Sequence, residues 1–207
     1  MSVPDAQPRR SRGPFLALIA VALLVLFFSD LKAYDLWWHL KAGQQILGTG
    51  RMPHADPFSY TAGGNPWTYH SWLAGVVLYL VHAATGTVGL IALRSLLIVS
   101  SLLLAWLAAR RRGVGAGLAA VLVLAAAFQL QTRALTRPYL FSFPLLMVFY
   151  LTVQGAFERA APEAWSETGR VPDKTWWLWG GGGRLIALPV LMLFWANLHG
   201  GFIVGML

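Results

Sequence analysis

Asp35 and His39 form a pair whose types and spacing could support catalysis. They lie four positions apart in the segment DLWWHL, so on a helix their side chains share one face. A carboxylate beside a histidine can act as a general base, because partial burial and neighbouring charges adjust its pKa. Asp35 could equally cap the N-terminus of that helix, where the helix dipole favours a negative charge. The sequence leaves both roles open.

Three more ionisable residues belong to the same polar segment: His54, Asp56 and His70. Together with Asp35 and His39, they could bind a divalent cation through carboxylate and imidazole groups. No tight ligand spacing such as H-E-x-x-H is present, and Asx-type turns with solvated histidines would give the same composition. We therefore predict no required cofactor and retain His54 and Asp56 as candidate ligands of a divalent metal. Asp56 and His70 are also candidate catalytic residues.

Three arginines stand inside or at the end of apolar runs: Arg94, Arg133 and Arg137. Arginine at a membrane edge is costly and often marks an anionic ligand, and its forked donors suit phosphate. The alternative for each is that its head group reaches the lipid head groups. Asn197 and His199 stand beside two glycines in the last apolar block, where polar groups need partners. We predict that these five residues bind substrate, with packing as an equal alternative for Asn197 and His199.

The elements that must position these residues are apolar helices. Of the 207 residues, 57% are hydrophobic and 12% are charged, against the roughly 25% charged residues of soluble domains. The apolar residues fall in long blocks, which predicts an integral membrane protein. The net charge of +8 sits mainly between these blocks, so we interpret it as an orientation signal and not as a nucleic-acid surface. The absence of cysteine excludes disulfides and thiolate metal sites.

We predict an all-α membrane protein with five transmembrane helices, at residues 14–28, 88–109, 115–130, 139–157 and 185–207. The block 72–84 is too short to cross, and leaving it outside places more lysine and arginine in the cytoplasm. A large external loop, residues 30–87, then carries two juxtamembrane helices at 36–47 and 70–84.

The remaining parts follow from this topology. Residues 1–13 form a basic tail, and the N-terminus lies in the cytoplasm. Residues 14–207 form a single transmembrane domain, in which residues 158–184 are a cytoplasmic loop rich in proline, glutamate and glycine. The chain stops within an apolar run, which predicts that the domain is incomplete at its C-terminus.

The order of these parts resembles the GT-C glycosyltransferase superfamily, whose bacterial members take a sugar from a polyprenyl-phosphate carrier. The resemblance covers residues 14–160. Asp35 opens a juxtamembrane helix that contains Gly43, and a second such helix follows at 70–86. The next span has the early Arg94 and ends in the basic turn RRRG. The segments DLWWHL, PHADPFSYT, WTYHSWL and WANLHGGF also resemble a group of bacterial membrane proteins with this layout.

The resemblance implies a GT-C-like fold and an active site at the outer face of the bacterial inner membrane, beneath the external loop. Asp35 would be the base toward the acceptor, and the outer arginines would hold the phosphate of a polyprenyl-phosphate-linked sugar. The chain has Ser71 where the resemblance places an acidic residue after the histidine, and Asp56 is the substitute for that missing acid.

We expect a glycosyltransferase that transfers a hexosyl or pentosyl group, with the lipid bilayer and the carrier-linked sugar as partners and no nucleic acid. The alternative is a non-catalytic membrane protein of polysaccharide export or assembly, or an inactive GT-C relative, which Ser71 and the short chain favour. A transporter would be expected to have inverted repeats and ionisable residues at mid-membrane, and neither is evident.

Overall fold

The computed structural model describes residues 13–31, 34–164 and 186–206. Within them the chain is helical, apart from turns, loops and one isolated β-bridge between Ala55 and Pro66, which confirms the all-α prediction for this part of the chain. The elements are α1 (Gly13–Phe27), α2 (Leu36–Thr49), α3 (Trp72–Arg111), α4 (Ala116–Gln131), η1 (Pro138–Phe141), α5 (Ser142–Ala164), α7 (Ala187–Leu198) and η3 (Gly200–Gly205).

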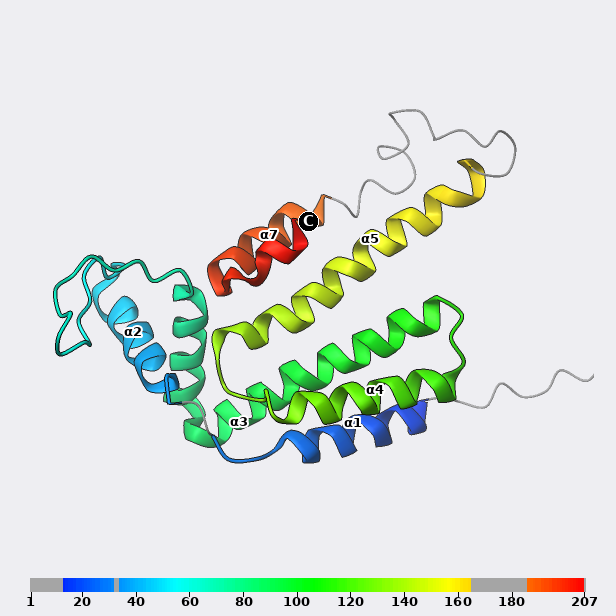
Figure 1. Cartoon of the computed structure of the whole chain (residues 1–207), viewed down its shortest axis with the longest axis horizontal. Coiled ribbons are helices and arrows are strands. Elements are labelled where there is room, and N and C mark those ends of the chain that lie inside the picture. Colours follow the sequence, from blue (N-terminus) through cyan, green and yellow to red (C-terminus); the bar gives the residue numbers. More distant parts are fainter. Residues whose placement is uncertain (1–12, 32–33, 165–185, 207) are drawn as a thin grey trace, which may run out of the picture.

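The C-terminal part of α3 is the central element of a helix bundle. It contacts α1, α4 and α5, which lie around it (Figure 1). Apolar side chains from these helices and η1 form the core of the bundle, with these residues buried: Leu23, Phe27, Ile98, Val99, Leu102, Val123, Ala127 and Leu140. The end of α1 and the segment before η1 lie together at one end of this bundle (Figure 1).

The outward faces of the bundle helices are apolar as well. Large exposed side chains on α1 and α4 include Val21, Val25, Val121, Leu122 and Phe128. A helix that is hydrophobic all round is typical of a membrane span. Two described helices, Trp72–Arg111 and Pro138–Ala156, are long and apolar enough to cross a membrane, while α4 and α7 are shorter. The total of five spans stays a prediction.

α3 is 40 residues long and bends at Gly86, where φ is +65° and ψ is −156°. Glycine adopts this backbone conformation without the strain that a side chain would cause. The part of α3 before the bend packs beside α2 across the end of the bundle, and the part after it enters the bundle (Figure 1). Helices at the predicted positions 70–84 and 88–109 are therefore present, as two arms of one bent helix. Arg111 ends α3 at the opposite end of the bundle from α2.

α2 and the first arm of α3 cross in backbone contact at two glycines. A Cβ at Gly43 would lie 2.2 Å from the carbonyl oxygen of Gly75, and a Cβ at Gly75 would lie 2.4 Å from the hydroxyl of Tyr69. Neither position has room for a side chain. This close crossing fixes the residues at the start of α2 relative to those at the start of α3.

The last apolar block does not form the continuous span predicted over 185–207. α7 is 12 residues long, about 18 Å, against the ~30 Å of a hydrocarbon core. It ends at Leu198. The next residue, His199, has an extended backbone, and η3 then folds back beside α7 (Figure 1). The His199 side chain accepts a hydrogen bond from the backbone N–H of Gly201, which satisfies the start of the new turn in place of a continued helix.

Candidate functional site

A pocket of about 250 Å³ lies where the α2–α3 crossing meets the end of the bundle. Its walls come from segments that are far apart in the sequence and include these polar residues: Asp35, His39, Tyr69, His70, Arg137 and His199. Five of the predicted site residues thus meet in one place. Five other predicted residues lie outside it: His54, Asp56, Arg94, Arg133 and Asn197.

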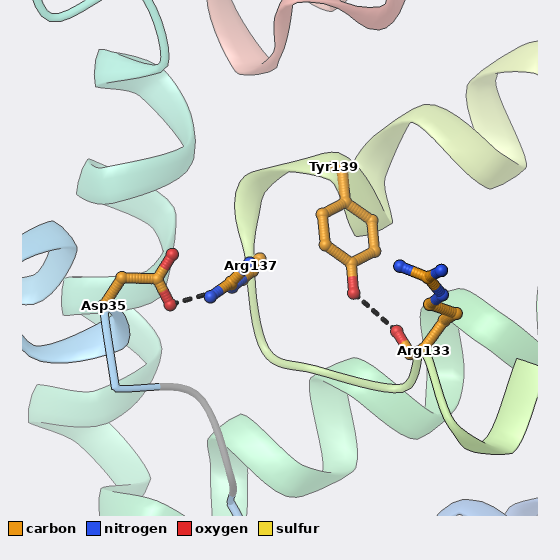
Figure 2. Close-up of polar contacts among 4 residues, drawn as sticks. All are labelled: Asp35, Arg133, Arg137 and Tyr139. Atoms are coloured by element: carbon orange, nitrogen blue, oxygen red, sulfur yellow. Dashed lines mark hydrogen bonds and ion pairs between the residues drawn. The ribbon is translucent and has the colours of Figure 1, made fainter.

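Asp35 and Arg137 form an ion pair across this pocket (Figure 2). The Nε of Arg137 donates to Oδ1 of Asp35 at 2.8 Å, over 102 positions of sequence. Asp35 precedes the first residue of α2, yet its side chain makes no capping hydrogen bond to that helix. Arg137 has an extended backbone because it precedes Pro138. The capping role considered for Asp35 is therefore not seen, and its carboxylate belongs to the pocket.

His39 lies on the same helix as this pair, one turn after Asp35, and is buried. Its Nδ1 lies 2.7 Å from the hydroxyl oxygen of Tyr69. Burial lowers the pKa of His39 from 6.5 to about 4, with partial opposition from the charge of Asp35. Burial also raises the pKa of the Tyr69 hydroxyl. Both groups are therefore uncharged at neutral pH, and His39 is a hydrogen-bonding group of the wall.

Aromatic rings support this wall. Tyr69 stacks on Trp67 with 5.1 Å between ring centroids, and Trp38 lies over the ring of His39 at 3.7 Å. Phe58 contacts the edge of Trp67 from the loop between α2 and α3. Ring contacts of this kind add stability beyond the burial of area alone. Trp38 and Tyr69 of this cluster give the pocket an aromatic part of its lining.

His70 and Ser71 complete the pocket at the start of α3. His70 is exposed, whereas Ser71 is buried and precedes the first residue of α3. Ser71 occupies the position where the family resemblance implies an acidic residue. The described pocket therefore contains a single carboxylate, that of Asp35.

His199 reaches the pocket from the end of α7, whereas Asn197 does not. The Oδ1 of Asn197 accepts a hydrogen bond from the indole N–H of Trp72 at 2.7 Å, and its Nδ2 donates to the carbonyl of Leu193. Asn197 thus ties α7 to the start of α3, which corresponds to the packing alternative. The ring of His199 contacts the edge of Tyr139 and borders the pocket.

Arg94 is buried beneath the end of α1 and faces backbone carbonyls. Its terminal nitrogens donate to the carbonyl oxygens of Phe27 at 3.0 Å and Asp30 at 3.1 Å, to that of Ser29, and across to Ala134 at 3.2 Å. The last carbonyls of a helix lack intrahelical partners, and a cation suits the negative end of the helix dipole. The structure therefore assigns Arg94 to closing the end of α1 and does not support its prediction as a phosphate ligand.

Arg133 lies in the turn after α4, on the other side of Tyr139 from Arg137 (Figure 2). Its side chain is exposed, and its carbonyl accepts a hydrogen bond from the Tyr139 hydroxyl. The two arginines were predicted to act together. The structure separates them, and only Arg137 borders the pocket.

Asp56 and His54 lie in the loop between α2 and α3. Oδ1 of Asp56 accepts the backbone N–H groups of Phe58 at 2.8 Å and Ser59 at 3.0 Å, which is an Asx-type turn. Hydrogen bonds from the Ser59 side chain and these amides lower the pKa of Asp56. This placement does not support Asp56 as a catalytic residue. Within the described ranges, no group of three or more metal-ligating side chains is placed to hold an ion.

Several site residues were not predicted from the sequence. Tyr69 and Tyr139 border the pocket, and Ser142 lies 3.0 Å from the Nδ1 of His199. The aromatic run W-T-Y-H was visible as part of a segment, but nothing in its spacing identified Tyr69 as the partner of His39. Comparisons of the chain with protein families, curated proteins and solved structures find no match.

Proposed function

We propose that the protein is a membrane glycosyltransferase of the GT-C type, at the outer face of a bacterial inner membrane. It would take a sugar from a polyprenyl-phosphate carrier and transfer it to a lipid, glycan or protein acceptor. The observation that carries this proposal is the Asp35–Arg137 ion pair, which lines a pocket at the end of an apolar helix bundle. It combines a guanidinium, which can bind an anion, with a carboxylate, which can accept a proton.

Arg137 supports the phosphate half of the proposal. Its Nε is engaged by Asp35, and its two terminal nitrogens have no protein partner within the described ranges. The ion pair thus orients the guanidinium while leaving the forked donors that suit phosphate. The exposed apolar faces of the neighbouring helices would let the prenyl chain remain in lipid while its head group enters the pocket.

Asp35 supports the transfer half. In the proposed step the acceptor oxygen forms a bond to the anomeric carbon of the sugar, and the bond from that carbon to the carrier phosphate breaks. The phosphate leaves with the electron pair and is stabilised by Arg137. The proton of the acceptor hydroxyl passes to the Asp35 carboxylate, whose second oxygen is not used in the ion pair.

A second candidate is a non-catalytic membrane protein that binds a carrier-linked sugar during polysaccharide export or assembly. The observation that favours it is the single carboxylate among the described residues of the pocket, because Ser71 and the distant Asp56 provide no second acid. Both candidates require carrier binding. Only the enzyme requires Asp35 as a base.

Asp35→Asn separates the two candidates. An asparagine oxygen can still accept the hydrogen bond from Arg137, so we expect the fold and carrier binding to survive, whereas loss of a general base lowers the rate by about 10²–10⁴. The measurement is transfer of labelled sugar from a polyprenyl-phosphate carrier by the purified chain in nanodiscs. Full activity in a folded Asp35→Asn protein would exclude the base. Binding without transfer in the unsubstituted chain would establish the non-catalytic candidate, and absence of both would refute the proposal.

The membrane orientation has its own test. Ala62 lies in the loop between α2 and α3, before the first residue of α3, and Gly113 follows its last residue. In a chain without cysteine, Ala62→Cys and Gly113→Cys give the only thiols for an impermeant reagent. We expect intact cells to be labelled at position 62 alone. Labelling of both positions from the same side would contradict the topology.

A further inference from the structure

Trp195, Ser142 and Gly201 form hydrogen bonds that lead to His199, and none of them has a role in the proposed transfer. The indole Nε1 of Trp195 lies 2.8 Å from Oγ of Ser142, and this Oγ lies 3.0 Å from Nδ1 of His199. The backbone N–H of Gly201 donates to the same Nδ1 at 2.9 Å. Residues of α5 and η3 thus contact one ring nitrogen, and Trp195 of α7 supports the contact from α5 through Ser142.

The direction of these bonds follows from which groups can donate. An indole N–H and a backbone N–H are donors only. The Ser142 oxygen must therefore accept from Trp195, which leaves the hydroxyl proton of Ser142 for His199. Because Gly201 also donates to Nδ1, the single lone pair of this nitrogen is shared by two donors. A neutral imidazole with an unprotonated Nδ1 carries its proton on Nε2.

The surroundings leave little freedom for another arrangement. Trp195 is fully buried. A Cβ at Gly201 would lie 2.6 Å from Oγ of Ser142 and 2.9 Å from Nδ1 of His199, so a side chain at this position would push the two partners apart. This contact gives a physical reason for glycine directly after the segment W-A-N-L-H-G.

We infer that Trp195, Ser142 and Gly201 are positioning residues that hold His199 in its Nε2–H tautomer, so that Nε2 donates to a phosphate oxygen of the pocket ligand. This inference rests on the proposed function for the identity of the ligand. The ring of His199 borders the pocket that Arg137 also lines, and its Nε2 has no partner in the part of the chain that the structure describes. A neutral donor of fixed direction would orient the phosphate that the guanidinium attracts.

The tautomer can be measured without any ligand, by NMR of the full chain in nanodiscs with ¹⁵N-labelled histidine. The chain has five histidines, and the signal lost in His199→Asn identifies the residue. At neutral pH we expect Nε2 to be protonated and Nδ1 to be an unprotonated acceptor. Ser142→Ala removes one of the two hydrogen bonds to Nδ1 and should shift the Nδ1 resonance, and Ser142→Thr, which keeps the hydroxyl, should restore the original signal. A proton on Nδ1 in the unsubstituted chain, or no change in Ser142→Ala, would overturn the positioning role.

The donor role is tested by binding of a polyprenyl phosphate, with the uncharged polyprenol as the matched ligand. His199→Asn keeps an acceptor near the place of Nδ1 but has no group at Nε2, so phosphate binding should weaken about tenfold or more. His199→Gln places an N–H near Nε2 and should bind within about threefold of the unsubstituted chain. Equal phosphate binding by His199→Asn would overturn the donor role. If the unsubstituted chain binds no polyprenyl phosphate, the proposed function and the donor role both fail, while the NMR result still decides the positioning role.

Discussion

Arg94 and Arg137 look alike in the sequence but occupy contrasting regions of the molecule. Arg94 is 1% exposed, and its terminal nitrogens contact three backbone carbonyls at the end of α1 and the carbonyl of Ala134 after α4. Arg137 is partly exposed and is held through Nε by one carboxylate, with its terminal nitrogens left to the pocket. A guanidinium at such a position can therefore donate its hydrogen bonds either to backbone carbonyls or to a ligand. The two cases differ in which of its nitrogens already donate to protein groups.

The largest effect expected from this comparison is loss of stability in Arg94→Leu. The substitution would remove the guanidinium that donates to the carbonyls of Phe27, Ser29 and Asp30, and charge-assisted hydrogen bonds contribute about 1.5–3 kcal/mol each. We expect the free energy of unfolding to fall by roughly 3 kcal/mol or more, measured by denaturant titration in detergent micelles. Arg133→Leu is the matched control at an exposed position and should change stability by about 0.5 kcal/mol or less. An Arg94→Leu protein of unchanged stability would remove the structural role.

The stability of the chain should depend on pH through His39, which lines the pocket. Burial lowers its pKa in the folded state from 6.5 to about 4, so between these values the unfolded chain binds the proton more readily. Stability should therefore fall as the pH drops from 6.5 to about 4 and should stop falling from this cause below that. The full effect is about 3 kcal/mol. The measurement is the unfolding free energy of the unsubstituted chain minus that of His39→Gln across this window; a flat difference would contradict the buried, neutral His39.

A smaller effect separates Arg137 from its neighbour Arg133. Arg137→Ala removes the guanidinium that borders the pocket, and we expect polyprenyl phosphate to bind about 10- to 100-fold more weakly. Arg133→Ala removes an exposed guanidinium outside the pocket and should leave binding within about twofold. Isothermal titration with both variants in nanodiscs makes the comparison. Equal losses would indicate general attraction of the anion by surface charge and not a built site.

The sequence predicted the helices of this fold better than their ends. Alanine- and leucine-rich runs without charge predicted the apolar helices around α3, and the short length of the 72–84 block predicted a separate arm before Gly86. Composition could not show that the two arms would remain one bent helix, because the break depends on a single backbone conformation. It also did not predict that the last block turns back at His199, since that turn depends on a local hydrogen bond from Gly201.

The candidate site was predictable where its residues lie close in sequence and not where they meet through the fold. Asp35 and His39 were paired by helical spacing, and both border the pocket. The partner of Asp35 was not predictable, because three arginines had the same surroundings in the sequence and only tertiary packing assigns their nitrogens. Tyr69 was missed for the same reason: its hydroxyl reaches His39 only through the close crossing of α2 and α3.

The bend at Gly86 is a point about which the first arm of α3 can rotate relative to the bundle. The arm of α3 from Trp72 to the bend is about 20 Å long, so a rotation of about 10° at Gly86 displaces its far end by about 3–4 Å. That far end carries His70 and Ser71, whereas Arg137 belongs to the bundle on the other side of the bend. A rotation at Gly86 would therefore move His70 and Ser71 relative to Arg137. The hydrogen bond from Trp72 to Asn197 joins the start of this arm to α7 in the position described.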